Sequence, residues 1–243
     1  PIRPKSIKGA DRPEVYTSRN VVDIIRLKEG VASGKIRDVA VIGGGFIGIE
    51  TAENLRKLGK QVTVIEAMDQ ILAPLDYDFV QMVQKEMMDH GVQVIVGDGV
   101  KEIDGSQVLL ASGKAVPAQA VVLAIGVAPE TGLARQACLE IGETGGIKVD
   151  HNYRTSDENI YAVGDAIEVF QQLTQKPGRL ALAGPALRQA RAAADSMYGR
   201  PCANKGVIGS CAIRVFDLNI AATGLNEKAA RKAGIVSVGG PVR

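Results

Sequence analysis

A glycine-rich stretch directly after an apolar strand limits what this chain can fold into more than any other feature. Residues 39–50 read Val-Ala-Val-Ile-Gly-Gly-Gly-Phe-Ile-Gly-Ile-Glu, an apolar run that turns through glycines into a helix. Gly43, Gly45 and Gly48 permit a tight turn, a close backbone approach to a phosphate and close packing of helix on strand. The N-terminus of the helix offers unpaired N–H groups and the positive end of its dipole. The stretch therefore predicts that the chain binds a dinucleotide.

The residues that follow the glycines support this interpretation. Gly48, Ala52 and Leu55 give the helix over residues 47–58 a small apolar face, and Gly59 is placed to end it. A β-branched strand over residues 61–66 then ends in Glu66, 18 residues after Gly48 and near the spacing of a ribose-binding acid. We expect Glu66 to favour NAD(H), because a carboxylate repels a 2′-phosphate. The alternative is a surface turn followed by a solvated strand-end glutamate.

Composition excludes several classes of protein. A chain of 243 residues with 46% hydrophobic content can bury one or two cores, and 4% aromatic content without Trp suits an aliphatic α/β sheet. Basic clusters interleaved with aromatic residues are absent from the sequence, so nucleic acid is not an expected partner. No apolar run approaches the roughly 20 residues of a membrane span, and three scattered cysteines indicate a reducing compartment. We expect a soluble, cytoplasmic protein.

The first residues predict that the chain begins inside a longer polypeptide. Residues 1–5 read Pro-Ile-Arg-Pro-Lys, which is typical of an extended connector and carries no signal for the start of a domain.

Periodicity along the chain predicts α/β architecture with a parallel sheet and a β-meander. The first part has a helix over 18–34, strands at 36–42, 61–66, 92–96, 100–103, 107–110 and 121–125, and helices over 47–58 and 76–89, the latter from recurring Phe79, Met82, Val83 and Met87. Asp104-Gly105 predicts a two-residue hairpin turn. The later part has helices at 130–138, 189–197 and 226–233, strands at 147–149, 160–163, 211–216 and 220–222, and a turn at 142–146.

A second constellation carries a resemblance to a known family. Residues 155–165 place Asp165 just after a strand and Gly164. Together, residues 43–50, 124–129, 155–165 and 182–185 resemble the pyridine nucleotide–disulfide oxidoreductase superfamily, in the family's order and over nearly the whole chain. Residues 209–228 look most like its single-cysteine branch, which includes coenzyme A-disulfide reductases, NADH-dependent persulfide reductases, NADH oxidases and NADH peroxidases.

The resemblance implies a domain organisation and two cofactors, FAD and NAD(H). Residues 1–35 are expected to form a connector and lead-in helix, and residues 36–128 a Rossmann-like NAD-binding domain inserted in a flavin-binding domain. Residues 129–200 would be the C-terminal part of that FAD-binding domain, and residues 201–243 the beginning of an α+β dimerisation domain of a homodimer.

The resemblance also assigns flavin contacts. Asp165, after Gly164, would bind a ribityl hydroxyl of FAD, although a simple strand-ending turn would also explain an aspartate there. Ala183 and Gly184 would place a helix N-terminus against the flavin ring, where its dipole stabilises negative charge, although an ordinary helix with Pro in its first turn has the same sequence. Arg19 is a further possible FAD contact.

On the nicotinamide side the resemblance points to the start of the helix over residues 47–58. Phe46, Ile47 and Glu50 would lie there, with Glu50 commonly pairing a lysine of the flavin domain that we cannot identify in this sequence. Gly126 and Val127 would close over the nicotinamide nucleotide.

The sequence departs from the family in several places. The first glycine fingerprint and the Ser-x-x-x-Cys segment with the redox thiol are not in this chain, and none of Cys138, Cys202 and Cys211 follows a glycine-led nucleotide turn. We therefore expect none of the three to be the redox cysteine. His90 and His151 have no charge partner placed by sequence and are expected to be incidental. Leu187 and Ala190 stand where relatives usually carry Asn and Gly, which puts any hydrogen bond from that Asn in doubt.

Three functions remain to be compared. The first is an FAD-dependent NADH oxidoreductase that passes hydride from NADH through FAD to a cysteine-based centre and a disulfide, persulfide, peroxide or oxygen acceptor. The second is a stand-alone NAD-binding module without redox activity. The third, reduction of a ferredoxin-like protein, is disfavoured by residues 215–228. The sequence does not name the terminal acceptor.

Overall fold

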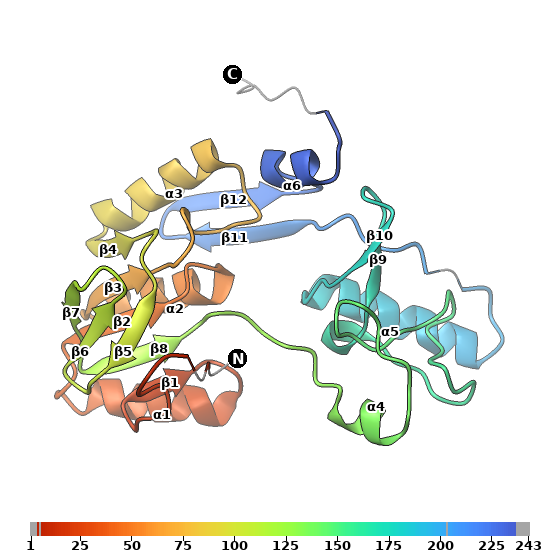
Figure 1. Ribbon diagram of the computed structural model, residues 1–243, viewed down its shortest axis with the longest axis horizontal. Coiled ribbons are helices and arrows are strands. Elements are labelled where there is room, and N and C mark those ends of the chain that lie inside the picture. Colours follow the sequence, from red (N-terminus) through yellow and green to blue (C-terminus); the bar gives the residue numbers. More distant parts are fainter. Residues whose placement is uncertain (1–3, 5, 203, 237–243) are drawn as a thin grey trace. The chain divides into compact units, whose positions relative to one another are not determined.

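The computed structural model describes residues 4, 6–202 and 204–236, which divide into two compact units. The first unit comprises the described residues up to 127 together with 212–222, and the second comprises the described residues of 128–211 and 223–236 (Figure 1). Each unit is described by itself.

The first unit is built on a five-stranded parallel sheet with the order β1-β8-β2-β3-β4. Its strands are β1 (Val15–Thr17), β8 (Ala120–Leu123), β2 (Asp38–Ile42), β3 (Gln61–Ile65) and β4 (Val92–Ile95). The connecting helices are α1 (Val21–Ala32), α2 (Phe46–Lys57) and α3 (Tyr77–Asp89). The Rossmann-like α/β architecture expected from the sequence is confirmed.

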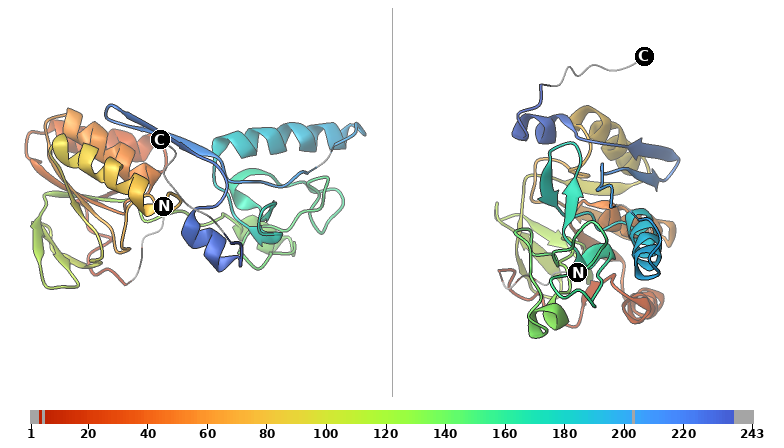
Figure 2. Two further views of the ribbon diagram at one scale, coloured as in Figure 1. Left: turned by 90° about the horizontal axis from the view of Figure 1, so that it is seen from above. Right: turned by 90° about the vertical axis from the view of Figure 1, so that its right-hand side faces the viewer.

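The sheet separates two hydrophobic cores. Val39, Val41 and Val64 point to one face, where they pack with buried residues of α1, α2 and α3. Ala40 and Ile42 point to the opposite face and pack with the antiparallel meander of β5 (Val100–Ile103), β6 (Gln107–Leu110) and β7 (Ala115–Pro117). The alternation of side chains along each strand therefore produces three layers: helices, parallel sheet and meander (Figure 2).

Helix ends in the first unit follow local sequence signals. The side chain of Asn20 caps α1 by accepting a hydrogen bond from the Asp23 N–H. Gly59 and Gly91 adopt φ values of +77° and +80° just after α2 and α3, a left-handed conformation that ends helices.

Several predicted elements needed correction in this unit. The chain before α1 is more than a connector, because β1 pairs with β8. The loop between β5 and β6 has three residues, 104–106, and not two. On α3 the buried face consists of Val80, Val83 and Met87, while Phe79 and Met82 are more than half exposed. Periodicity located the helix, but the apolar residues on two adjoining faces left its inward side ambiguous.

A hairpin far along the chain from the parallel sheet packs in the first unit. It consists of β11 (Cys211–Val215) and β12 (Leu218–Ala222), joined at Phe216 and Asp217. Ile213, Val215 and Phe216 are buried in the same core as α2 and α3. Both strands were expected from the sequence, but their packing was not.

The second unit has fewer and shorter strands than the first unit. It contains α4 (Gly132–Gln136), the 3₁₀ turn η1 (Gly164–Ala166), the pair β9 (Val169–Gln171) and β10 (Lys176–Gly178), α5 (Ala183–Met197) and α6 (Glu227–Lys232). The strands predicted at 147–149 and 160–163 make only isolated bridges. β9 and β10 were not predicted, since Pro and Gly in β10 give no strand signal.

Within the described residues, no helix has the length and apolar character to cross a membrane.

Candidate functional site

The glycine turn between β2 and α2 has the close packing that its sequence requires. Gly43 has φ +108°, and a Cβ there would lie 2.5 Å from the Ala124 carbonyl oxygen. A Cβ on Gly48 would lie only 1.9 Å from the Gly43 carbonyl oxygen, so α2 can rest on the turn only if residue 48 is glycine. A Cβ on Gly45 would meet no described atom within 4 Å. The fold itself requires glycine at positions 43 and 48. Gly45 is not required by packing, and it leaves open space in front of the backbone.

Sheet order places the predicted nucleotide residues at one edge. β8, β2 and β3 are parallel neighbours, so the segments after their carboxyl ends begin at the same edge of the sheet. These segments carry Gly126, Gly43 and Glu66. β2 lies at the point where the chain order reverses, between β3 on one side and β8 on the other. In open α/β sheets this is where a crevice for ligands forms.

The start of α2 presents the residues expected near nicotinamide. Gly45 is the N-cap residue, and because it has no side chain it leaves the first-turn N–H groups to other acceptors. Phe46 is half-buried, whereas Ile47 and Glu50 are exposed. Gly126, at φ +103°, and Val127 are exposed beyond β8. The structure leaves all of these residues accessible, and their contacts with a nucleotide stay a prediction.

Glu66 makes two hydrogen bonds that the sequence did not suggest. Its Oε2 accepts from the Gly44 N–H at 2.7 Å, and its Oε1 accepts from the Met68 N–H at 2.8 Å. The carboxylate thus ties the glycine turn to the segment after β3. Spacing identified Glu66 as a candidate but could not reveal this contact with the turn.

The predicted flavin residues of the second unit meet at η1 and the start of α5. Gly164 has φ +79° and donates its N–H to Gln189 Oε1 at 2.7 Å, while the side chain of Asp165 is exposed. Ala183 and Gly184 are exposed in the first turn of α5. Leu182 is the N-cap residue, and its apolar side chain cannot cap the helix. The pieces expected to hold one ligand are therefore adjacent.

Other positions from the sequence analysis are also accessible. Arg19 is exposed just before α1, and its N–H donates to Asp23 Oδ2 at 3.0 Å. Leu187 and Ala190 lie on the exposed surface of α5, with 61% of Leu187 accessible. A flavin contact by Arg19 stays a prediction.

The three cysteines are free thiols. Cys138 is exposed, and Cys202 and Cys211 are half-buried. Burial raises the pKa of the Cys202 thiol, and the negative charges of Asp195 and Asp150 add to the effect. A raised pKa lowers the thiolate fraction and hence nucleophilicity, which supports the expectation that Cys202 is not the redox thiol.

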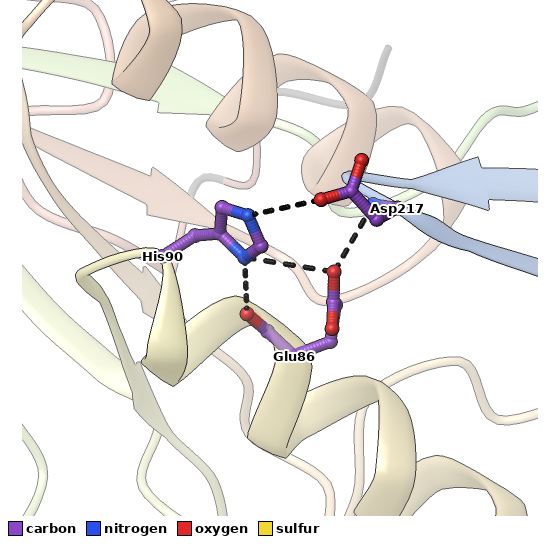
Figure 3. A group of neighbouring side chains, drawn as sticks. All are labelled: Glu86, His90 and Asp217. Atoms are coloured by element: carbon purple, nitrogen blue, oxygen red, sulfur yellow. Dashed lines mark hydrogen bonds and ion pairs between the residues drawn. The ribbon is translucent and has the colours of Figure 1, made fainter.

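We expected His90 to be incidental, and this prediction is wrong. His90 joins α3 to the β11–β12 hairpin. Its ring stacks on Phe216 with centroids 4.1 Å apart, and its Nδ1 donates to the Glu86 carbonyl oxygen at 2.9 Å. Its Nε2 lies 3.6 Å from Asp217 Oδ2 (Figure 3). Its partners come from the hairpin and from one turn earlier in α3. The sequence alone does not bring the hairpin to α3, so no signal could have identified this role.

Among the described residues, Glu86, His90 and Asp217 form the one group of ligand-type side chains close enough to share a metal ion, with donor atoms within 4.8 Å. Glu86 Oε1 already accepts a hydrogen bond from the Asp217 N–H at 3.0 Å. His90 and Asp217 line a cavity of about 450 Å³. The same cavity is lined by three positively charged side chains, those of Arg56, Lys57 and Arg214, which would repel a cation. We therefore assign the group a structural role: its contacts hold the β11–β12 hairpin against α3.

Glu53 on α2 is the second anchor of the hairpin. It is 7% exposed, pairs with Lys57, and accepts a hydrogen bond from the Phe216 N–H at 3.1 Å. Burial acts to raise its pKa, but hydrogen bonds from Lys57 and the Phe216 N–H, with the charges of Lys57 and Arg214, outweigh burial and lower the pKa. The carboxylate form is therefore favoured by folding.

Replacing Glu53 with alanine is expected to lower the free energy of unfolding by about 1–3 kcal/mol, because the buried Phe216 N–H loses its acceptor. Since the folded-state pKa is lowered, the stabilising contribution is present above the ordinary carboxyl pKa and is lost as the pH falls through the lowered value. Urea titrations at several pH values measure both effects. Glu29→Gln, on the exposed surface of α1, is the control. Equal loss of stability from neutral pH down to strong acid would contradict the assignment to the carboxylate.

Comparisons with known proteins agree with this geometry. The sequence profile of the family described as pyridine nucleotide-disulphide oxidoreductase matches residues 1–190. The chain is 34% identical over 200 residues to an NADH oxidase of Streptococcus pneumoniae, covering 81% of this chain and 43% of that protein.

Two solved structures have closely similar folds. Reduced CoADR-RHD of Bacillus anthracis is 42% identical with a TM-score of 0.94, covering 97% of this chain and 43% of that one. An NAD-dependent persulfide reductase from A. fulgidus is 36% identical with a TM-score of 0.93, covering 96% and 44%. The chain spans about half the length of the curated relatives it matches.

Proposed function

The chain belongs to the pyridine nucleotide-disulphide oxidoreductase family, and we propose that it forms the NAD-binding part and a portion of the FAD-binding part of an NADH oxidoreductase. In the whole protein, hydride would pass from NADH through FAD to a cysteine-based centre. The acceptor would be a disulfide, persulfide, peroxide or oxygen. Relatives named NADH oxidase and NAD-dependent persulfide reductase support this proposal.

The observation that carries the proposal is the glycine turn at the reversal point of the parallel sheet. Gly43 and Gly48 are fixed by close backbone contacts, while Gly45 leaves the approach to the backbone open. A pyrophosphate at this position would meet the first-turn N–H groups of α2 and the positive end of its dipole. The residues present therefore fit a dinucleotide.

The fit to FAD is partial, as expected for a chain that spans part of its relatives. Asp165 offers an exposed carboxylate that could accept hydrogen bonds from ribityl hydroxyls. The first-turn N–H groups of Ala183 and Gly184 would stabilise negative charge near the flavin ring. FAD, when bound, supplies the hydride-accepting ring. This chain would orient NADH toward it by holding the nucleotide along the sheet edge between Gly43, Glu66 and Gly126.

Glu66 gives a test of the preferred nucleotide. Replacing Glu66 with alanine is expected to raise the NADPH-to-NADH affinity ratio about tenfold or more, because the charge that repels the 2′-phosphate is lost. NADH affinity itself should fall, since the carboxylate also holds the Gly44 N–H. Titrations of both nucleotides against the full-length variant measure this. Glu143→Gln, exposed in the second unit, should leave the ratio unchanged. An unchanged ratio in the Glu66 variant would remove Glu66 from nucleotide selection.

The visible spectrum of the purified full-length protein tests the redox proposal. Flavin bands that bleach on anaerobic addition of NADH support hydride transfer to FAD. A colourless protein that binds NADH would favour the stand-alone NAD-binding module. Flavin bands that NADH does not bleach would overturn the proposed electron path. Reoxidation by a disulfide, persulfide, peroxide or oxygen then identifies the acceptor.

Homodimer formation and a cytoplasmic location, both expected from the sequence, belong to the same proposal. Light scattering of the full-length protein measures the oligomeric state.

A further inference from the structure

We infer that Gln189 is a positioning residue for the flavin site: through Gly164 it holds the turn that presents Asp165 beside the start of α5. This inference rests on the proposed function, because it concerns how the proposed FAD contacts are placed. It assigns a role to a residue that neither the sequence motifs nor the resemblance had singled out.

Gln189 is buried for a reason that involves the turn. Its side chain is 5% exposed, and burying an amide without hydrogen bonds is costly. Its Oε1 accepts from the Gly164 N–H at 2.7 Å, a short and favourable distance. The hydrogen bond links two segments 25 residues apart.

Helix geometry directs this side chain toward the turn. Pro185, Gln189 and Ala193 are spaced four residues apart and form the buried face of α5. Side chains on a helix lean toward its N-terminus, so Gln189 reaches back toward the first turn, where Ala183 and Gly184 lie. The same amide therefore fixes η1 against the end of α5 that is proposed to face the flavin.

The turn itself depends on this anchor. Gly164 has φ +79°, and a Cβ there would lie 3.7 Å from the Ala186 Cβ, so the turn lies directly against α5. Its carbonyl oxygen accepts from the Ile167 N–H at 3.3 Å, which closes η1. Asp165 is the next residue, and its backbone follows the orientation set at Gly164. Loss of the Gln189 acceptor would leave the Gly164 N–H without this partner and free the turn to shift.

The test compares three variants of the full-length protein. Gln189→Met removes the accepting oxygen at similar volume, Gln189→Glu keeps an accepting oxygen, and Gln136→Met is the same change at an exposed position of α4. FAD dissociation constants are measured by flavin fluorescence, and hydrogen exchange of residues 164–167 is measured without FAD. We expect Gln189→Met to weaken FAD binding about tenfold and to speed exchange, with NADH affinity unchanged. Gln189→Glu should restore slow exchange, and Gln136→Met should behave as wild type.

A double-mutant cycle with Asp165→Ala separates positioning from general stability. If Gln189 acts through Asp165, the Gln189→Met change should have little further effect on FAD affinity once Asp165 is removed. Fully additive effects, or exchange at residues 164–167 as slow as in wild type, would overturn the inference. A wild-type protein that holds no FAD would refute the proposed function, while the exchange data would still decide whether Gln189 holds the turn.

Discussion

Replacing Gly48 with alanine should lower the free energy of unfolding by about 3 kcal/mol. The new Cβ would lie 1.9 Å from the Gly43 carbonyl oxygen. That oxygen belongs to backbone and cannot rotate away, and the Gly43 N–H is held by the Ile65 carbonyl oxygen at 2.8 Å. Helix α2 must therefore move off the turn, which also displaces the proposed phosphate site.

Denaturant unfolding of the full-length protein measures this effect. Gly99→Ala is the matched control, because a Cβ there meets only the Ala67 Cβ at 3.7 Å, an ordinary contact. If Gly48→Ala unfolds at the same denaturant concentration as wild type, α2 is not packed on the turn as described.

Replacing Gly45 with alanine should weaken NADH binding by about a hundredfold, or roughly 2.7 kcal/mol, while the protein remains folded. A Cβ at this position meets no described atom within 4 Å, so the free protein accommodates it. Gly45 is the N-cap residue of α2, where alanine is a poorer choice than glycine, and this costs at most about 1 kcal/mol. The methyl group would occupy the space in which a pyrophosphate approaches the backbone.

Isothermal titration with NADH, paired with denaturant unfolding, separates the two glycines. The main effect of Gly48→Ala should be a lower free energy of unfolding. The main effect of Gly45→Ala should be a lower NADH affinity, with little change in the free energy of unfolding. NADH affinity equal to wild type in Gly45→Ala would place the pyrophosphate elsewhere and would remove the main support for the proposed nucleotide site.

The β11–β12 hairpin is anchored to helices α2 and α3. Glu53 on α2 accepts from the Phe216 N–H, and Glu86 on α3 accepts from the Asp217 N–H. α2 is also the helix whose first turn adjoins the glycines. The hairpin therefore stabilises the end of α2 that lies away from the proposed phosphate site.

Local sequence signals were sufficient for the nucleotide-binding architecture. The glycine turn, the β-branched strands and the glycines that end α2 and α3 act through residues close in sequence, so their patterns could be interpreted without a structure. The sequence predicted the parallel sheet and the β-meander, and the structure showed that the meander packs on the face of the sheet opposite the helices. Weak signals failed where a strand was short or contained Pro and Gly, as in β1 and β10, because pairing with a distant segment supplies most of what stabilises such strands.

The sequence by itself determined that this chain folds as a dinucleotide-binding α/β protein, because close neighbours encode its turn, helices and strands. Only the tertiary structure decided which distant groups meet. Glu53 and the Phe216 N–H are 163 residues apart, Gly44 and Glu66 are 22 apart, and Gly164 and Gln189 are 25 apart. Each is a hydrogen bond between a side chain and a distant backbone N–H. Because every residue except proline carries that same N–H, the identity of the partner leaves no mark in the sequence.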